Sequence, residues 1–173
     1  AVIDNARQDV PLAAVLCSPI VGLSVSELAE LRLAAPEEDI FGALLVVNEP
    51  GAKFSASLRE KVDAFLRLLK GWRDLVRRVS VPELIWQIYR DTGYYDYVGG
   101  MAGGLLRQAN LRMLADRARD YEETNFRGLF RFLRFIEKMQ QMETDLSAAR
   151  TLGEGEDVVR IMTIHKSKGL EFP

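Results

Sequence analysis

Residues 55–79 carry apolar side chains at alternating steps of three and four, which strongly limits how this chain can fold. Such spacing puts the side chains along one side of an α-helix of about seven turns. A helix with one apolar side is stabilised mainly by other elements that cover that side. The pattern therefore predicts a packed helical domain, with this stripe in its core: Leu58, Val62, Phe65, Leu66, Leu69, Trp72, Leu75, Val76 and Val79.

Most of the remaining chain also has helical periodicity. Ser24 with Glu27, and Ser80 with Glu83, have the spacing of capping boxes, in which each side chain satisfies a free N–H of the other residue. Pro36 is expected to start a helix, because acidic residues 37–39 suit the positive end of a helix dipole. Gly93 is expected to end one. The predicted helices cover residues 6–17, 24–33, 36–47, 55–79, 80–92, 105–121 and 126–146.

Residues 94–104 are rich in aromatic residues and glycine, so they predict a loop. Its tyrosines, at 94, 95 and 97, either stack on unpaired bases or belong to a turn anchored by a buried Asp96. Gly99 and Gly104 have the spacing of a phosphate-binding P-loop. Leucines follow where that loop needs Lys and Ser or Thr, which excludes the motif.

Residues 158–164, VVRIMTI, change the pattern to a short β-branched run, which predicts a buried strand. One strand cannot form a sheet, so its partners are expected outside this chain. The predicted fold is mainly α. Residues 1–157 form an irregular multi-helix insertion, and residues 158–173 begin an incomplete α/β domain. We expect the chain to be a piece of a longer protein.

Composition narrows the function classes. No apolar run reaches the roughly 20 residues of a membrane span, and one cysteine with one histidine excludes an ordinary His/Cys metal site. A lone cysteine forms no intrachain disulfide, which fits the reducing cytoplasm. The net charge of −2 hides a gradient: residues 1–57 carry eight acidic and three basic side chains, whereas residues 58–152 carry thirteen acidic and seventeen basic ones.

The last eleven residues, TIHKSKGLEFP, place a hydroxyl, an imidazole and two lysines after the predicted strand. Such groups at the carboxyl edge of a sheet suit phosphate contacts. A plain charged turn is the alternative from residue types alone.

This segment closely resembles motif V of superfamily 1 DNA helicases of the UvrD/RecB group. The resemblance extends over the whole chain. It includes the runs IDNARQDVPL (3–12), LCSP (16–19), TGYYD (92–96), RQANL (107–111) and FRGLF (126–130). These runs are similar to the accessory 2B region of the AddA family, the larger helicase-bearing chains of bacterial ATP-dependent helicase/nuclease complexes. The resemblance implies that residues 1–157 are a 2B-like domain and that residues 158–173 begin the RecA-like 2A domain.

The resemblance also implies roles for single residues. In this group, the Thr and His of motif V lie by single-stranded DNA, which corresponds to Thr163 and His165. The Gly and Glu lie toward the nucleotide, which corresponds to Gly169 and Glu171. Lys166 and Lys168 are expected near DNA phosphates, with their individual roles open.

For the parent protein, the resemblance implies an ATP-dependent helicase and exonuclease that uses ATP and Mg²⁺. It would process DNA ends in recombinational repair in the bacterial cytoplasm, with an AddB-like subunit as partner and no membrane contact. The fragment carries no identifiable P-loop or nuclease carboxylate cluster. We therefore expect it to be inactive alone and to need no cofactor.

A second candidate site is a basic stripe, formed by Arg127, Arg131, Arg134 and Lys138. Steps of four, three and four put these residues on one helical face. Apolar residues are expected on the opposite face, at Leu129, Phe130, Leu133 and Ile136. Arg77 and Arg78 would extend the stripe if the helices pack side by side. The stripe is either a phosphate track for duplex DNA, a solvated face, or a set of arginines that pair with the acidic N-terminal third.

The remaining candidates are expected to be structural. Trp72, Trp86 and Cys17 are expected to be buried, and residues 107–110 to tie helices together rather than bind nucleic acid. Two rival functions stay open. One is a module that only contacts other proteins; the other is a free-standing helical regulator with a helicase-like tail.

Overall fold

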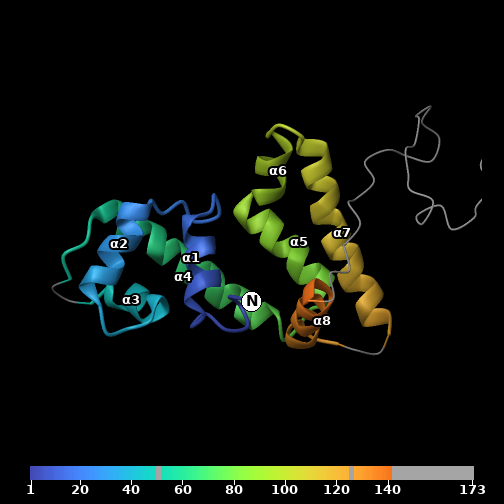
Figure 1. Ribbon diagram of the computed structural model, residues 1–173, viewed down its shortest axis with the longest axis horizontal. Coiled ribbons are helices and arrows are strands. Elements are labelled where there is room, and N and C mark those ends of the chain that lie inside the picture. Colours follow the sequence, from blue (N-terminus) through green and yellow to red (C-terminus); the bar gives the residue numbers. More distant parts are fainter. Residues whose placement is uncertain (50–51, 125–126, 142–173) are drawn as a thin grey trace, which may run out of the picture.

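A computed structural model describes residues 1–49, 52–124 and 127–141. Within these ranges the chain forms eight α-helices and no strand (Figure 1), which confirms the prediction of a mainly α fold. The helices are α1 (Asp9–Cys17), α2 (Val25–Ala34), α3 (Ile40–Val46), α4 (Ala56–Leu75), α5 (Val81–Thr92), α6 (Tyr94–Gly99), α7 (Gly104–Glu123) and α8 (Leu129–Gln141). The predicted strand at 158–164 lies outside the described residues.

The helices form two lobes with separate cores. In the first lobe, α1, α2 and α3 pack on the first part of α4, around Leu12, Leu31, Leu44 and Phe65. In the second lobe, α5, α7 and α8 share a core that includes Tyr89, Ala115, Ala118 and Phe132. Helix α4 runs from one lobe to the other (Figure 1).

Short polar contacts fix the first lobe. Asp39 is the N-cap of α3, where its carboxylate accepts a hydrogen bond from the Gly42 N–H at 2.6 Å. This bond, with the Arg7 guanidinium 2.7 Å away, holds the pKa of Asp39 below its ordinary value. The predicted start of this helix at Pro36 is therefore wrong, because the cap is the later acidic residue. The capping box of Ser24 and Glu27 is confirmed at the start of α2.

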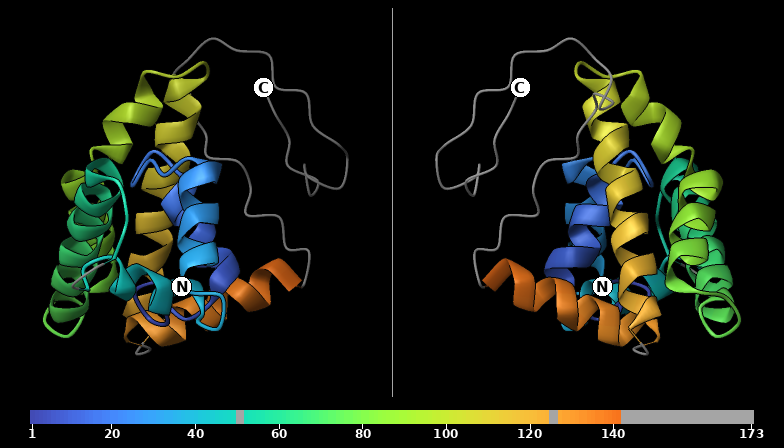
Figure 2. Two further views of the ribbon diagram at one scale, coloured as in Figure 1. Left: turned by 90° about the vertical axis from the view of Figure 1, so that its left-hand side faces the viewer. Right: turned by 90° about the vertical axis from the view of Figure 1, so that its right-hand side faces the viewer.

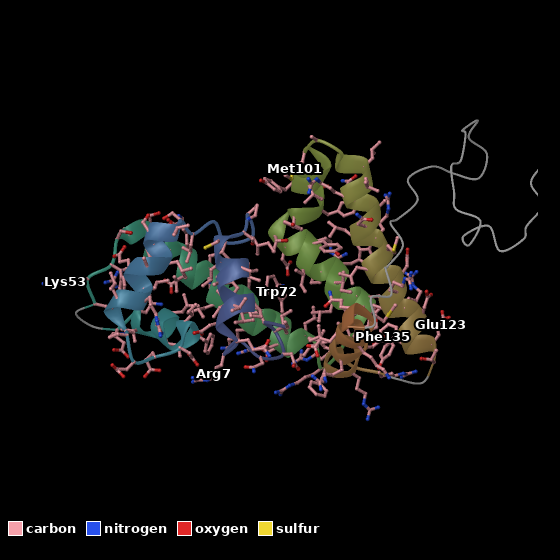
Figure 3. The ribbon with its side chains drawn as sticks, viewed as in Figure 1. Arg7, Lys53, Trp72, Met101, Glu123 and Phe135 are labelled. Carbon is pink, nitrogen blue, oxygen red and sulfur yellow. The ribbon has the colours of Figure 1, made fainter. Side chains whose placement is uncertain are left out.

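The buried residues of α4 all belong to the predicted apolar stripe, but the helix ends at Leu75, so the predicted end at residue 79 is wrong and Val76 and Val79 lie after the helix. Leu58, Val62, Phe65, Leu69 and Trp72 are buried. Trp72 stands between the lobes (Figure 3), and its indole N–H donates to the Asp91 carboxylate of α5 at 2.8 Å. The end of α4 is thereby tied to the end of α5.

The second lobe begins with the confirmed capping box of Ser80 and Glu83. Gly93 ends α5 in the left-handed conformation, at φ 62°. The predicted loop at 94–104 is wrong in its first half, because α6 starts directly after this turn. Tyr95 packs on Trp86 and Tyr89, with ring centroids 5.5 and 6.2 Å apart, so this tyrosine of the segment belongs to the core.

Helices α6 and α7 form a tight hairpin. A Cβ on Gly104 would lie 2.0 Å from the Gly99 carbonyl oxygen, so only glycine fits there. The Gln108 amide donates to the Tyr95 carbonyl at 3.1 Å, as expected of a residue that ties helices together. Across the lobe, the buried Tyr89 hydroxyl donates to the Leu111 carbonyl, and burial raises its pKa to about 12.

Helix α8 lies crosswise to α7, at the end of the second lobe opposite the α6–α7 hairpin (Figure 2). Its buried side holds Phe132 and Phe135, which pack on Tyr121 of α7 with ring centroids 5.7 and 4.9 Å apart. Phe130, predicted on the apolar face, instead leaves 60% of its surface exposed. That assignment is wrong, because the helix turns its other apolar edge toward α7.

Two smaller predictions are also wrong. Cys17 is exposed at the end of α1 rather than buried, and Asp96 is exposed in the first turn of α6. Over the residues that the structure describes, no helix combines the length and the apolar character that a membrane span requires.

Candidate nucleic-acid interface

The four residues of the basic stripe do not all belong to α8. Gly128 takes a φ of 97°, a conformation that favours glycine, and the helix begins at Leu129. Arg127 therefore stands before the helix, and the prediction that it continues one helical face is wrong. Arg131, Arg134 and Lys138 do lie on the exposed side of α8.

Within the helix, one arginine of the stripe has an acidic neighbour. The Arg134 guanidinium lies 3.0 Å from the Glu137 carboxylate, and both side chains are more than half exposed. Such surface pairs contribute little to stability and are screened by salt. A phosphate could thus compete for Arg134 at small cost.

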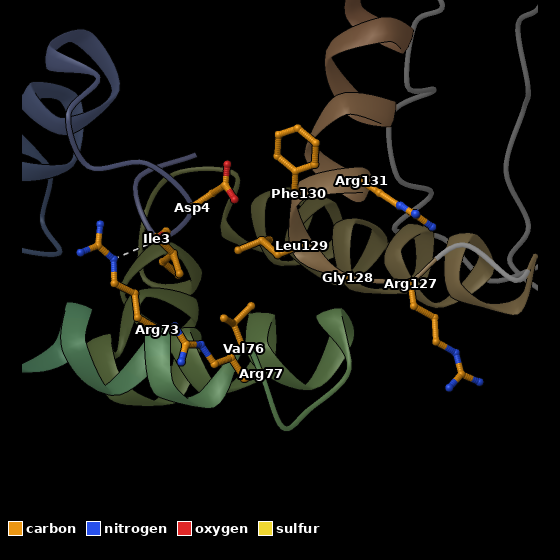
Figure 4. Close-up of a pocket in the computed structure, with 10 residues that line it drawn as sticks. All are labelled: Ile3, Asp4, Arg73, Val76, Arg77, Arg127, Gly128, Leu129, Phe130 and Arg131. Carbon is orange, nitrogen blue, oxygen red and sulfur yellow. Dashed lines mark hydrogen bonds between the residues drawn. The ribbon is translucent and has the colours of Figure 1, made fainter.

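The larger concentration of arginines lies in a hollow between α4 and the start of α8 (Figure 4). Its volume is about 540 Å³. Arg73 enters from α4 and Arg77 from the turn that follows α4, whereas Arg127 and Arg131 come from the α8 side. Among the described residues that line it, Asp4 is the one acidic residue. We call this hollow the arginine groove; its other lining residues are Ile3, Val76, Gly128, Leu129 and Phe130.

Arg73, in α4, and Arg77, just after α4, have different surroundings. The Arg73 guanidinium donates to the Ile3 carbonyl at 3.0 Å and lies 5.5 Å from the centre of the Phe41 ring, so it fastens the N-terminal segment to α4. Arg77 is exposed, and among the described residues it has neither an acidic partner nor a hydrogen bond. Of these two arginines, Arg77 is the one available to a ligand.

A second hollow, of about 920 Å³, adjoins the arginine groove. The two share Val76, Arg77, Arg127 and Gly128 among their lining residues. Arg78 and Arg119 add positive charge there, and Glu83, Glu122 and Glu123 add negative charge. Arg77 and Arg127 therefore stand at the junction of a continuous surface path, which is most positive in the arginine groove.

The chemistry of this path is that of an anion site. Guanidinium groups bind phosphate oxygens through paired N–H donors and stay charged at every physiological pH. Because the charges sit along an open path, the arrangement suits an extended polyanion better than a single small ion.

The sequence identified only part of this surface. Arg127 and Arg131 both line the arginine groove, and so does Arg77, which was expected to extend the stripe, whereas Arg134 and Lys138 do not line it. Arg73 was missed, although Lys70, Arg73 and Arg77 have helical spacing in the sequence. The motif V residues Thr163, His165, Lys166, Lys168, Gly169 and Glu171 lie outside the described residues.

The tyrosine candidate has a mixed outcome. Tyr94 and Tyr97 stack on each other, with centroids 6.3 Å apart, and Tyr97 is half exposed. Among the described residues, no group of three or more His, Cys, Asp and Glu side chains is placed to hold a metal ion.

Comparison with known proteins identifies a family and several similar proteins. The model of the UvrD-like helicase C-terminal domain family matches residues 48–173. The chain is 59% identical to the A subunit of the ATP-dependent helicase/nuclease of Geobacillus kaustophilus, 57% to that of Desulforamulus reducens and 58% to that of Bacillus cytotoxicus. Each match covers 99% of this chain but 14% of the relative, so the chain spans about one-seventh of their length.

Proposed function

The chain belongs to the UvrD-like helicase C-terminal domain family, and on that premise we propose that it is a region of an AddA-like helicase/nuclease protein driven by ATP. The similarity to the A subunits, over nearly the whole chain, supports this assignment. The complete protein would unwind and degrade double-strand DNA ends in recombinational repair, in the cytoplasm and with an AddB-like subunit as partner.

Within that protein, we propose that residues 1–157 form the 2B-like accessory domain and residues 158–173 begin the 2A domain. Thr163, His165, Lys166 and Lys168 would contact the single strand, and Gly169 and Glu171 the nucleotide. ATP and Mg²⁺ would be bound by the complete protein, and the chemistry they supply is phosphoryl transfer to water. This chain would be inactive alone.

The role that we propose for the described helices is to guide duplex DNA. The exposed arginines on and before α8, beside the arginine groove, are the observation that carries it. Phosphate contacts of this kind give affinity without sequence preference and weaken steeply with salt, because each contact releases counterions.

The test is binding of a forked DNA to the full chain at about 50 and 200 mM salt. Arg131→Glu/Arg134→Glu should abolish most of the binding, and affinity of the unaltered chain should fall at least tenfold between the two salt concentrations. Lys53→Glu/Arg67→Glu makes the same change of charge away from the arginine groove (Lys53, Figure 3), so it should bind normally. No binding by the folded chain at low salt would overturn the duplex-guiding role.

A second candidate, a module that contacts only protein, has its own supporting observation. The α6–α7 hairpin exposes Tyr97, Met101, Leu105 and Leu106, with 51, 40, 77 and 45% of each surface accessible. Apolar side chains gathered at a tip suit a protein partner. If this candidate is right, Leu105→Ser/Leu106→Ser should weaken assembly of the complete protein with its partner, while the α8 variant leaves DNA binding unchanged.

A further inference from the structure

Phe130 adds an exposed aromatic ring to the arginine groove, which a track made only of charged side chains would lack. It is the second residue of α8, its ring leaves the core, and 60% of its surface is exposed. In the close-up, the ring stands at the rim of the groove on the side of Asp4, and the side chain of Arg131, the next residue, extends away from it (Figure 4). A large exposed aromatic side chain among arginines is the pairing used to bind unpaired bases together with their phosphates.

The lining and the size of the groove also favour an unpaired base as the ligand. Its apolar lining comes from Ile3, Val76 and Leu129, on three different segments, and its volume of about 540 Å³ is that of a small-molecule pocket. A duplex keeps its base faces inside the stack, so it offers nothing to the Phe130 ring. An unpaired base offers a flat apolar face for the rim and a phosphate for the arginines.

We propose that the arginine groove binds single-stranded DNA, with a base stacked on Phe130 and the backbone following Arg77 and Arg127 toward the second hollow. This inference rests on the proposed function for its ligand, DNA. It goes beyond that function in assigning a single-strand site to the helical region itself, separate from motif V.

Stacking can be separated from charge by comparing two probes with the same number of phosphates. Fluorescence anisotropy would follow the full chain binding a labelled oligothymidine and a strand of equal length whose central positions are abasic. The unaltered chain should prefer the strand with bases by about fivefold or more, the range expected for one stacked base. Phe130→Ala should remove this preference, and Phe130→Tyr should keep it.

The arginines supply the matched test of charge. Arg77→Glu should weaken binding of both probes and reduce the slope of affinity against salt, because one phosphate contact is lost. The Lys53→Glu/Arg67→Glu variant serves as the control. Both Phe130 and Arg77 are exposed, so circular dichroism should show unchanged helix content in these variants.

The outcomes separate this inference from the proposed function. Equal affinity for the two probes, or equal loss of blunt-duplex and single-strand binding in Phe130→Ala, would overturn the single-strand site. Blunt-duplex binding that is weakened by Arg134→Glu, a residue that does not line the arginine groove, would still support the duplex-guiding role. Displacement of both DNA probes by polyglutamate at equal charge concentration, with no effect of Phe130→Ala, would instead assign the groove to an acidic protein.

Discussion

At the scale of single residues, Gly104 is where two backbone segments come closest. A Cβ there would stand 2.0 Å from the Gly99 carbonyl oxygen, and backbone cannot move aside as a flexible side chain does. Gly104→Ala should therefore destabilise the chain by about 1–3 kcal/mol, the usual range for overpacking. Urea unfolding followed by circular dichroism measures this difference.

Gly71 is the matched control. It is an exposed glycine within α4, and a Cβ added there meets no atom within 4 Å. Gly71→Ala should raise the free energy of unfolding by about 0.5–1 kcal/mol, because alanine favours the helix. Equal effects of the two substitutions would contradict the close approach in the α6–α7 hairpin.

Phe130 shows how far residue-scale prediction from sequence extends. The periodicity correctly identified an amphipathic helix with Arg131 and Arg134 on its outer side. It placed Phe130 with the buried residues because a sequence cannot tell how a helix is rotated against its neighbour. Tyr121 of α7 fixes that rotation by packing on Phe132 and Phe135, and this contact leaves Phe130 outside.

At the scale of elements, the capping boxes make a direct prediction about helix stability. The Ser80 hydroxyl accepts from the Glu83 N–H, and the Glu83 carboxylate accepts from the Ser80 N–H at 2.9 Å. Ser80→Ala should lower the free energy of unfolding by about 1 kcal/mol. Ser57→Ala, an exposed serine in the first turn of α4, should change it by less than about 0.5 kcal/mol.

The capping box of Ser80 and Glu83 also predicts that the free energy of unfolding depends on pH. Hydrogen bonds from the Ser80 N–H and hydroxyl lower the pKa of Glu83 from 4.5. Since the folded state then holds the proton less tightly than the unfolded one, the stabilisation is present above pH 4.5 and is lost as the pH falls through the lowered pKa. Glu83→Gln should make unfolding less sensitive to acid in that window. An unchanged acid profile would contradict the ionic contribution of the box.

Elements were predictable where the cause of the fold is local. Both capping boxes and the Gly93 turn lie within four residues of sequence, and all three form. The predicted start at Pro36 was wrong because two acceptable starts compete there, and the contact of Asp39 with Arg7 decides between them. Helix α6 was missed because its tyrosines form a helix against α5, which no local rule requires.

At the scale of the whole molecule, the arginine groove could not have been predicted. It requires α4 to lie beside the start of α8, although α5, α6 and α7 separate the two in the chain. The helical spacing of Arg73 and Arg77 is visible in the sequence. The sequence does not show which helix packs opposite these two arginines. The gradient of charge did indicate that the basic surface would lie within residues 58–152, the middle of the chain.

The two separate cores predict that the lobes lose structure independently. Leu44 is fully buried in the first lobe, and Leu44→Ala should destabilise its surroundings by about 2–5 kcal/mol. Because neither core contains a residue of the other, amide hydrogen exchange should quicken in α1–α3 and the first part of α4, while α5, α7 and α8 keep their protection.

Phe132→Ala should give the reverse pattern, since Phe132 belongs to the second core. Mass spectrometry of exchanged peptides resolves the two lobes, and the end of α4 is the informative segment. Trp72 there is tied to Asp91, so it should follow the second lobe even though the stripe that precedes it belongs to the first. Faster exchange in all helices after either substitution would mean that α4 couples the lobes into one cooperative unit. A DNA strand held between α4 and α8 would then stabilise the whole chain rather than one lobe.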